Sequence, residues 1–163
     1  MTNTVTSLLP ALRRFAFSLT GNQADADDIV QMTIEKLLQK GMPDDIEPLK
    51  WAFKICRNVW IDEYRSQKVR LKAVQNTELQ EPVCGDEQES FATQETLQRV
   101  NNALTTLPDE QRAIVSLVAV QGMAYKDVAH TLEIPVGTVM SKLSRARAAL
   151  YQLIKPDFTK ENA

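Results

Sequence analysis

The chain has 163 residues, 44% of them hydrophobic and 25% charged, and its formal net charge is -2. This length allows one domain or two small ones. The chain contains no run of eighteen apolar residues, and its start lacks the pattern of a signal peptide, so we expect a cytoplasmic protein without membrane insertion. A single histidine, His130, and two cysteines without CxxC spacing argue against a zinc site, and we expect no metal or other cofactor.

Apolar residues recur at helical spacing, and alternation of period two is hard to find, which predicts an all-α fold. The first predicted helix carries an apolar stripe and ends at Gly21. The members of this stripe are Leu8, Leu12, Phe15 and Leu19.

The second predicted helix follows an acidic entry, and acids near a helix N-terminus are favourable. It stops at the breakers of residues 41–48, "GMPDDIEP". The acids are Asp25, Asp27 and Asp28, and the expected apolar stripe is Ile29, Ile34, Leu37 and Leu38.

The third predicted helix, residues 49–68, has a basic stripe along one side. The stripe consists of Lys54, Arg57, Asn58, Ile61, Arg65 and Lys68. Lys54, Arg57 and Arg65 are candidates for contacts with DNA phosphates. Asn58 is either a helix-surface asparagine or a residue that reads a base edge or an extruded base. The aromatic residues on the other sides of this helix are expected in the core.

Residues 73–95 contain six acids and no base, with Pro82 and Gly85 as breakers. Such a stretch reads as a flexible acidic linker. We therefore predict two small helical domains, residues 1–68 and 96–158, joined by a linker over residues 69–95.

The second domain is predicted to contain a helix-turn-helix, because two short helices at its end are separated only by residues 132–137, "LEIPVG". Glu133 lies at a turn position where glycine is common, and a left-handed backbone there costs about 1 kcal/mol. One side of the last helix is expected to be buried through Val136, Val139, Leu143, Ala146 and Leu150.

The remaining side chains of the last helix are hydrogen-bond donors, as contacts with phosphates and base edges require. They are Thr138, Ser141, Lys142, Ser144, Arg145 and Arg147. The alternative is an ordinary amphipathic helix with a solvated basic side.

Three segments together resemble the extracytoplasmic-function (ECF) sigma factors, the minimal bacterial initiation factors with two helical domains. Residues 107–150 resemble the promoter-reading domain of that family, from the entry "LPDEQR" to the "VGTV" that starts the recognition helix. Residues 11–38 resemble the polymerase-binding part of the first domain, and residues 51–65, "WAFKICRNVWIDEYR", resemble the helix that opens promoter DNA.

The resemblance implies a transcription initiation factor that binds core RNA polymerase and promoter DNA, with a cognate anti-sigma factor as a further partner. By matching position, polymerase would be contacted by Asp28, Val30, Gln31 and Ile34. Asn58 and the loop 41–48 would face the minus-ten strand. The minus-thirty-five groove would be contacted by Ser141, Lys142, Ser144 and Arg145.

Two positions depart from the family pattern. Met32 stands where the family usually has an acid, and Met140 where it usually has a base.

A chain of net charge -2 is expected to bind free DNA weakly, because nonspecific affinity comes from phosphate neutralisation. This favours a specificity subunit over an autonomous helix-turn-helix regulator, the first alternative. A decoy that only sequesters an anti-sigma factor is the second alternative, and the retained Asn58, Lys142 and Arg145 argue against it. An enzyme is the least favoured class, because His130 has no evident acid or nucleophile partner and no phosphate-binding glycine loop is present.

Overall fold

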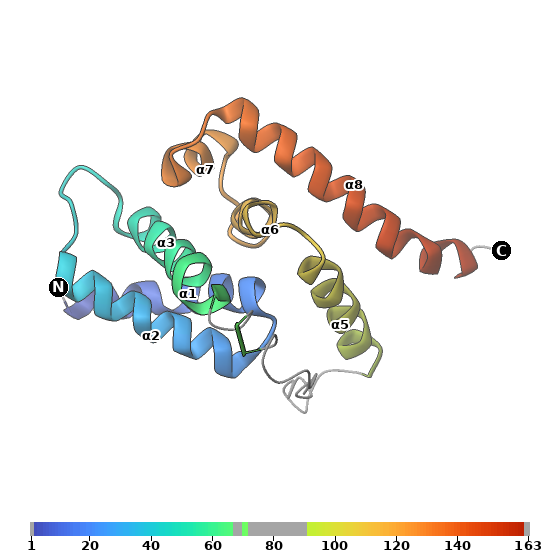
Figure 1. Ribbon diagram of the computed structural model, residues 1–163, viewed down its shortest axis with the longest axis horizontal. Helices are drawn as coiled ribbons and strands as arrows, with labels where there is room; N and C mark the ends of the chain where they lie inside the picture. Colours follow the sequence, from blue (N-terminus) through green and yellow to red (C-terminus); the bar gives the residue numbers. More distant parts are fainter. Residues whose placement is uncertain (1, 67–69, 72–90, 162–163) are drawn as a thin grey trace. The chain divides into compact units, whose positions relative to one another are not determined.

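The structure is a computed structural model that describes residues 2–66, 70–71 and 91–161 (Figure 1). Within these ranges the chain is helical with short connections and contains no strand, which confirms the predicted all-α class. The chain forms two compact units, Met1–Pro82 and Val83–Ala163. Most of the predicted linker, residues 72–90, lies outside the described residues.

The first unit packs three helices around one core: α1 (Thr2–Thr20), α2 (Gln23–Lys40) and α3 (Pro48–Val59). The stripe expected on the first helix is confirmed, since Leu8, Leu12, Phe15 and Leu19 are all buried. Phe15 meets Phe53 of α3 with ring centroids 5.1 Å apart, at an angle typical of favourable aromatic pairs. The three helices therefore share a continuous apolar interior.

On α2 the buried side differs from the expected one. Leu38 is 57% exposed and Ile34 is half-buried, so these two residues lie toward the outer side of the helix. Ile29 and Leu37 of the expected stripe are buried as predicted, and Thr33, four residues from each of them, completes the buried row. Thr33 can be buried because its hydroxyl donates to the carbonyl oxygen of Ile29 at 2.7 Å. A polar residue thus occupies a position of the buried stripe that an apolar pattern does not reveal.

Cys56, in the middle of α3, is fully buried, and its burial makes the thiol unreactive. Desolvation raises the pKa of its thiol to about 12, although a hydrogen bond with Thr33 acts in the opposite direction. A thiol with such a pKa stays protonated at neutral pH and is a poor nucleophile. Cys56 is therefore a core residue of the first unit.

The third helix was predicted to continue to Lys68 and does so only in part. The α-helix ends at Val59 and passes into a π-helical segment, η1 (Trp60–Arg65), and residues 67–69 lie outside the described residues. The wider hydrogen-bond spacing of a π-helix changes the residue period. The basic stripe extrapolated at α-helical spacing therefore does not hold beyond Val59.

The second unit contains α5 (Phe91–Thr105), α6 (Asp109–Val115), a π-helical continuation η2 (Ser116–Val120), α7 (Tyr125–Leu132) and α8 (Val136–Glu161). Helix α8 packs against α5, α6 and α7. Residues 91–95 were assigned to the linker, and this is wrong because they form the first turn of α5. The acidic composition used for that assignment does not prevent a helix that is supported by α8.

The start of α2 depends on one capping side chain, that of Asn22. Its Oδ1 atom accepts hydrogen bonds from the backbone N–H groups of Ala24 at 2.8 Å and Asp25 at 3.2 Å. These groups have no partner within the helix, so the cap satisfies two donors.

We predict that Asn22→Ala lowers the free energy of unfolding of the first unit by about 1 kcal/mol, because two N–H groups lose their acceptor. Asn22→Ser, which retains an oxygen for capping, should lose clearly less. The measurement is denaturant unfolding followed by tryptophan fluorescence, since both tryptophans, Trp51 and Trp60, lie in the first unit. Equal stability of the wild type and the alanine variant would contradict the role of the cap.

Candidate nucleic-acid interface

The turn between α7 and α8 is tight and closed by backbone hydrogen bonds. Glu133 has φ 57° and ψ 45°, so its backbone is left-handed at the turn position where glycine is common. The N–H of Glu133 donates to His130 at 3.4 Å, and the N–H of Ile134 donates to Ala129 at 3.0 Å. This is the Schellman pattern of a helix C-terminus, formed here without the usual glycine. The two helices are thus joined as in a helix-turn-helix.

The beginning of α8 is fixed by Pro135. Its carbonyl oxygen accepts from the N–H groups of Thr138 at 3.0 Å and Val139 at 3.2 Å, which closes the first turn. The helix therefore starts directly after the turn, and its N-terminal residues follow the left-handed residue closely.

The buried side of α8 is shorter than the sequence predicted. Val139, Leu143 and Ala146 are buried, whereas Leu150 is half-buried and Val136 is 38% exposed. Val136 is the first residue of α8 and follows the exposed Pro135, so it lies at the open end of the stripe.

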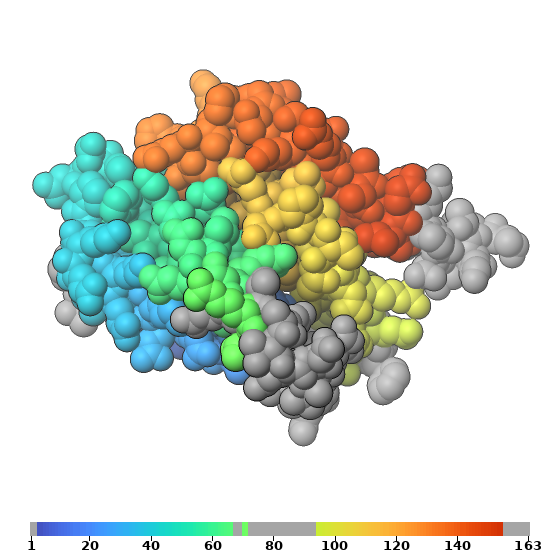
Figure 2. All heavy atoms as spheres, in the orientation of Figure 1, coloured from blue at the N-terminus to red at the C-terminus, as the bar shows by residue number. Residues whose placement is uncertain are grey.

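The opposite side of α8 is a continuous exposed surface, and the atoms of α8 form an unbroken stretch in the space-filling view (Figure 2, orange to red). We call it the outer surface of α8. Its members, at helical spacing, are Gly137, Met140, Ser141, Ser144, Arg145 and Ala148. A Cβ atom at Gly137 would meet nothing within 4 Å, so neither packing nor backbone strain requires glycine there.

The six residues of this helix that were predicted to contact DNA differ in their exposure and in the side of the helix on which they lie. Ser141, Ser144 and Arg145 lie on the outer surface. Thr138 is half-buried at its edge, and Arg147 is exposed beside Tyr125, whose hydroxyl oxygen is 3.5 Å from an Arg147 nitrogen.

The side chain of Lys142 points toward α6 of the same unit. Its ammonium group forms an ion pair with Glu110 of α6, and both side chains are less than a third exposed. A cation that faces a carboxylate of its own chain is less available to a phosphate.

In the first unit, the predicted DNA-contacting residues are all half-buried. A guanidinium nitrogen of Arg57 donates to Oδ1 of Asn58 at 3.1 Å. The Lys54 ammonium lies 5.3 Å from the centre of the Trp51 ring, and the Arg65 guanidinium lies 6.0 Å from that of Trp60. Both distances suit cation–π contacts. The cations are therefore held along the helix and not extended away from it.

The predicted polymerase-binding residues of α2 do not share one side. Asp28 and Gln31 are exposed and Ile34 is half-buried, whereas Val30 is only 5% exposed and belongs to the core. The exposed Leu38 continues the row of Gln31 and Ile34 at spacings of three and four residues. We call Asp28, Gln31, Ile34 and Leu38 the outer surface of α2.

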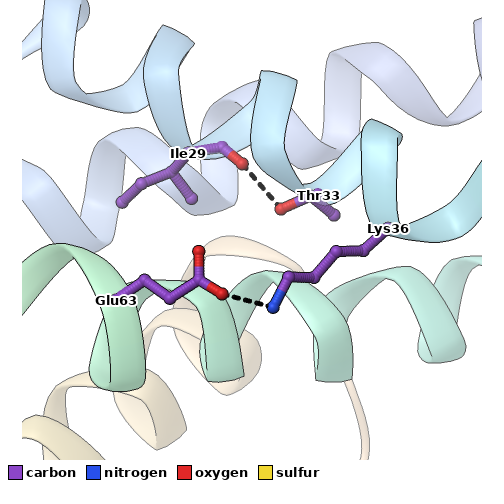
Figure 3. A network of polar contacts seen from close by, with 4 residues as sticks. All are labelled: Ile29, Thr33, Lys36 and Glu63. Carbon is purple, nitrogen blue, oxygen red and sulfur yellow. Dashed lines mark hydrogen bonds and ion pairs between the residues drawn. The ribbon is translucent and has the colours of Figure 1, made fainter.

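An ion pair that the sequence did not indicate joins α2 to the π-helical end of the third helix (Figure 3). The Lys36 ammonium lies 2.5 Å from a carboxylate oxygen of Glu63, with the side chains 33% and 42% exposed. In Figure 3 the two side chains extend toward each other from their helices, one turn from the buried Thr33. The pair connects the helix that carries the polymerase candidates with the helix that carries Asn58.

The comparisons with known proteins divide the chain in the same way as the structure. Residues 4–70 match the family model "Sigma-70 region 2", and residues 97–150 match "Sigma-70, region 4". The ECF RNA polymerase sigma factor EcfG of Rhodopseudomonas palustris is 31% identical over 157 residues, which cover 94% of this chain and 84% of EcfG. The chain belongs to the ECF sigma factors.

Solved structures agree with this assignment. The sigma factor RpoE from Bartonella quintana, solved in complex with the anti-sigma factor NepR, superposes with a TM-score of 0.77 at 29% identity, covering 94% of this chain and 96% of RpoE. CnrH, solved with the cytosolic domain of CnrY, gives a TM-score of 0.69 at 26% identity, covering 96% and 88% of the two chains. This sigma factor is therefore a transcription initiation factor that binds core RNA polymerase and directs it to promoters.

Two further observations concern the described part of the chain. It contains no helix long and apolar enough to cross a membrane. Nor does it contain a group of three or more histidine, cysteine, aspartate or glutamate side chains placed to hold a metal ion.

We predict that the Lys36–Glu63 pair contributes a coupling free energy of up to about 1 kcal/mol, because both side chains are partly screened by water. Lys36→Glu and Glu63→Lys should each destabilise the first unit by like-charge repulsion, and the double exchange should restore most of the loss. Denaturant unfolding followed by tryptophan fluorescence measures all four proteins. Additive effects in the double variant would show that the two side chains do not interact.

Proposed function

We propose that this sigma factor divides its work among three surfaces. The outer surface of α8 reads the upstream promoter element. The basic side of α3, with Lys54, Arg57 and Asn58, faces the opened downstream element, and the outer surface of α2 docks on core polymerase. The observation that carries the first assignment is the polar, exposed N-terminal half of α8, held by a closed helix-turn-helix.

The polarity of the outer surface of α8 supports direct reading of DNA. Ser141 and Ser144 can donate or accept hydrogen bonds, and Arg145 can form a bidentate contact with guanine. In a helix-turn-helix the N-terminal residues of the second helix approach base edges. Gly137 leaves the first turn open, so the backbone there can approach a DNA strand closely.

The distribution of charge supports a subunit that depends on polymerase for DNA binding. The net charge is -2, and two lysines, Lys36 and Lys142, are engaged by carboxylates of the same chain. These pairs add to the effect of the net negative charge, and affinity for free DNA is expected to be low. Polymerase overcomes this limit by holding both DNA-binding units near the promoter, which raises their effective concentration.

The docking surface on α2 combines one acid, one amide and two apolar side chains. Leu38 is more than half exposed although it is a large apolar residue, and it lies beyond the half-buried Ile34 on the same side. A partner that covers this row gains apolar burial, with Asp28 at the edge for charge complementarity. Val30, which the resemblance included, supports this surface from the core.

We further propose an anti-sigma factor as a regulatory partner, because both solved relatives described above were captured with such a protein or domain. The sigma factor works by binding and not by catalysis, and it works in the cytoplasm, where polymerase and promoters are. Its two functional domains correspond to residues 1–68 and to a second domain up to 158 that starts at Phe91, where α5 begins.

Arg145 and Lys142 offer a matched test of promoter reading, because they lie three residues apart on one helix and carry the same charge. We predict that Arg145→Ala weakens holoenzyme binding at the upstream element by about 1–3 kcal/mol if the contact is base-specific. Lys142→Ala should affect promoter binding less, because its ammonium group faces Glu110, and should lower the stability of the second unit slightly by removing this ion pair. The measurements are holoenzyme affinity for a promoter fragment and thermal unfolding. Equal losses of promoter affinity in both variants would mean that charge alone, and not position, matters.

Docking is tested separately on α2. We predict that Leu38→Asp weakens binding to core polymerase in the absence of DNA by about tenfold or more, and that Asp28→Lys, at the edge of the surface, weakens it by less. Asp27 is an exposed acid on the neighbouring side of the same helix turn, so Asp27→Lys is the charge-matched control.

If Arg145→Ala lost polymerase affinity while Asp28→Lys kept it, the roles of the α8 and α2 surfaces would be reversed. Tight, specific duplex binding without polymerase would favour an autonomous regulator.

A further inference from the structure

An apolar ridge runs along the edge between the buried stripe and the outer surface of α8. Val136 and Met140 are 38% and 53% exposed, and their spacing of four residues places them on one side of the helix. Both belong to the first turn and a half of α8, which starts at Val136. We call these two residues the apolar ridge.

The ridge is not part of the packing of the second unit. The interior contacts of this part of α8 are made by Val139 and Leu143, which are buried. Met140 is followed by Ser141 and lies one turn before Ser144, both exposed. Met140 is a large apolar side chain among exposed polar neighbours, and a ligand that covers it gains apolar burial.

The position of the ridge indicates which part of DNA it meets. In a helix-turn-helix the first turns of the second helix point at base edges in the major groove, whereas phosphates are contacted from the sides. The base edges there present hydrogen-bonding groups with one apolar exception, the C5-methyl group of thymine.

We propose that Val136 and Met140 read thymine in the upstream promoter element by apolar contact with its methyl group, with Met140 as the principal contact. The proposal rests on the promoter-reading role of α8 given above. The thioether side chain of Met140 is unbranched and adaptable, so it can close around a methyl group without a fixed geometry. Arg145, on the same outer surface, reads or anchors the neighbouring positions through charge.

The experiment removes only the methyl group. Holoenzyme with the full chain is first used to select upstream elements from a randomised promoter library. Each thymine of the selected element is then replaced by deoxyuridine, which retains the hydrogen-bonding groups and lacks the methyl group. Binding of these duplexes is measured for holoenzymes with wild-type, Met140→Ala and Arg145→Ala chains. Circular dichroism verifies that each variant is folded, as expected for exposed positions.

We expect the wild-type holoenzyme to bind about fourfold more weakly when deoxyuridine replaces thymine at one or two positions. A fourfold loss is the effect expected when the burial of one methyl group is lost. The Met140→Ala holoenzyme should bind thymine and deoxyuridine duplexes equally. The Arg145→Ala holoenzyme should bind all duplexes more weakly and retain the wild-type ratio between them.

Several results would overturn the proposal. They are a selected element without thymine, a wild-type holoenzyme indifferent to deoxyuridine, or a ratio that persists in Met140→Ala. A loss of core polymerase affinity in Met140→Ala, with the ratio unchanged, would assign the ridge to a protein contact instead. If no upstream element is selected, both this proposal and the role of α8 are wrong. If only Arg145→Ala has no effect, the proposal stands and the role of Arg145 is wrong.

Discussion

The burial of Val139, Leu143 and Ala146 against α6 and α7 fixes the rotation of α8, and the composition of its outer surface depends on this constraint. A shift by one residue would turn the helix by about 100° and exchange polar for apolar side chains on that surface. Burying a valine or leucine side chain is worth about 1.5–3 kcal/mol. The left-handed backbone of Glu133 costs about 1 kcal/mol, so the packing outweighs the strain of the turn.

Ion pairs within each unit engage two of the protein's lysines. Lys142 and Lys36 face Glu110 and Glu63, and each pair connects two helices. These pairs add little stability at their exposure, but they withdraw two cations from the surface. In a chain of net charge -2 this agrees with the low affinity for free DNA proposed above.

The sequence was sufficient for features that depend on local pattern. The all-α class and the buried stripe of α1 follow from periodicity, and the tight turn at Glu133 follows from the short segment between the last two helices. It was not sufficient where distant segments meet. The Lys142–Glu110 pair spans 32 residues, and the exposure of Leu38 depends on how α2 packs against α1 and α3. Residues 91–95 were placed in the linker because they follow an acidic, polar stretch, and composition alone does not show where α5 begins.

The π-helical turn after Val59 also limits where the first unit can read DNA. Arg65 lies over Trp60 beyond this turn, so the basic side that continues at α-helical spacing is confined to Lys54, Arg57 and Asn58. A guanidinium only donates hydrogen bonds, so the Asn58 atom that faces Arg57 is the amide oxygen. The amide NH₂ group then provides the donors of Asn58 for other partners. In the role proposed for it, Asn58 therefore selects hydrogen-bond acceptors on a base, and Arg57 acts by holding the amide in that orientation.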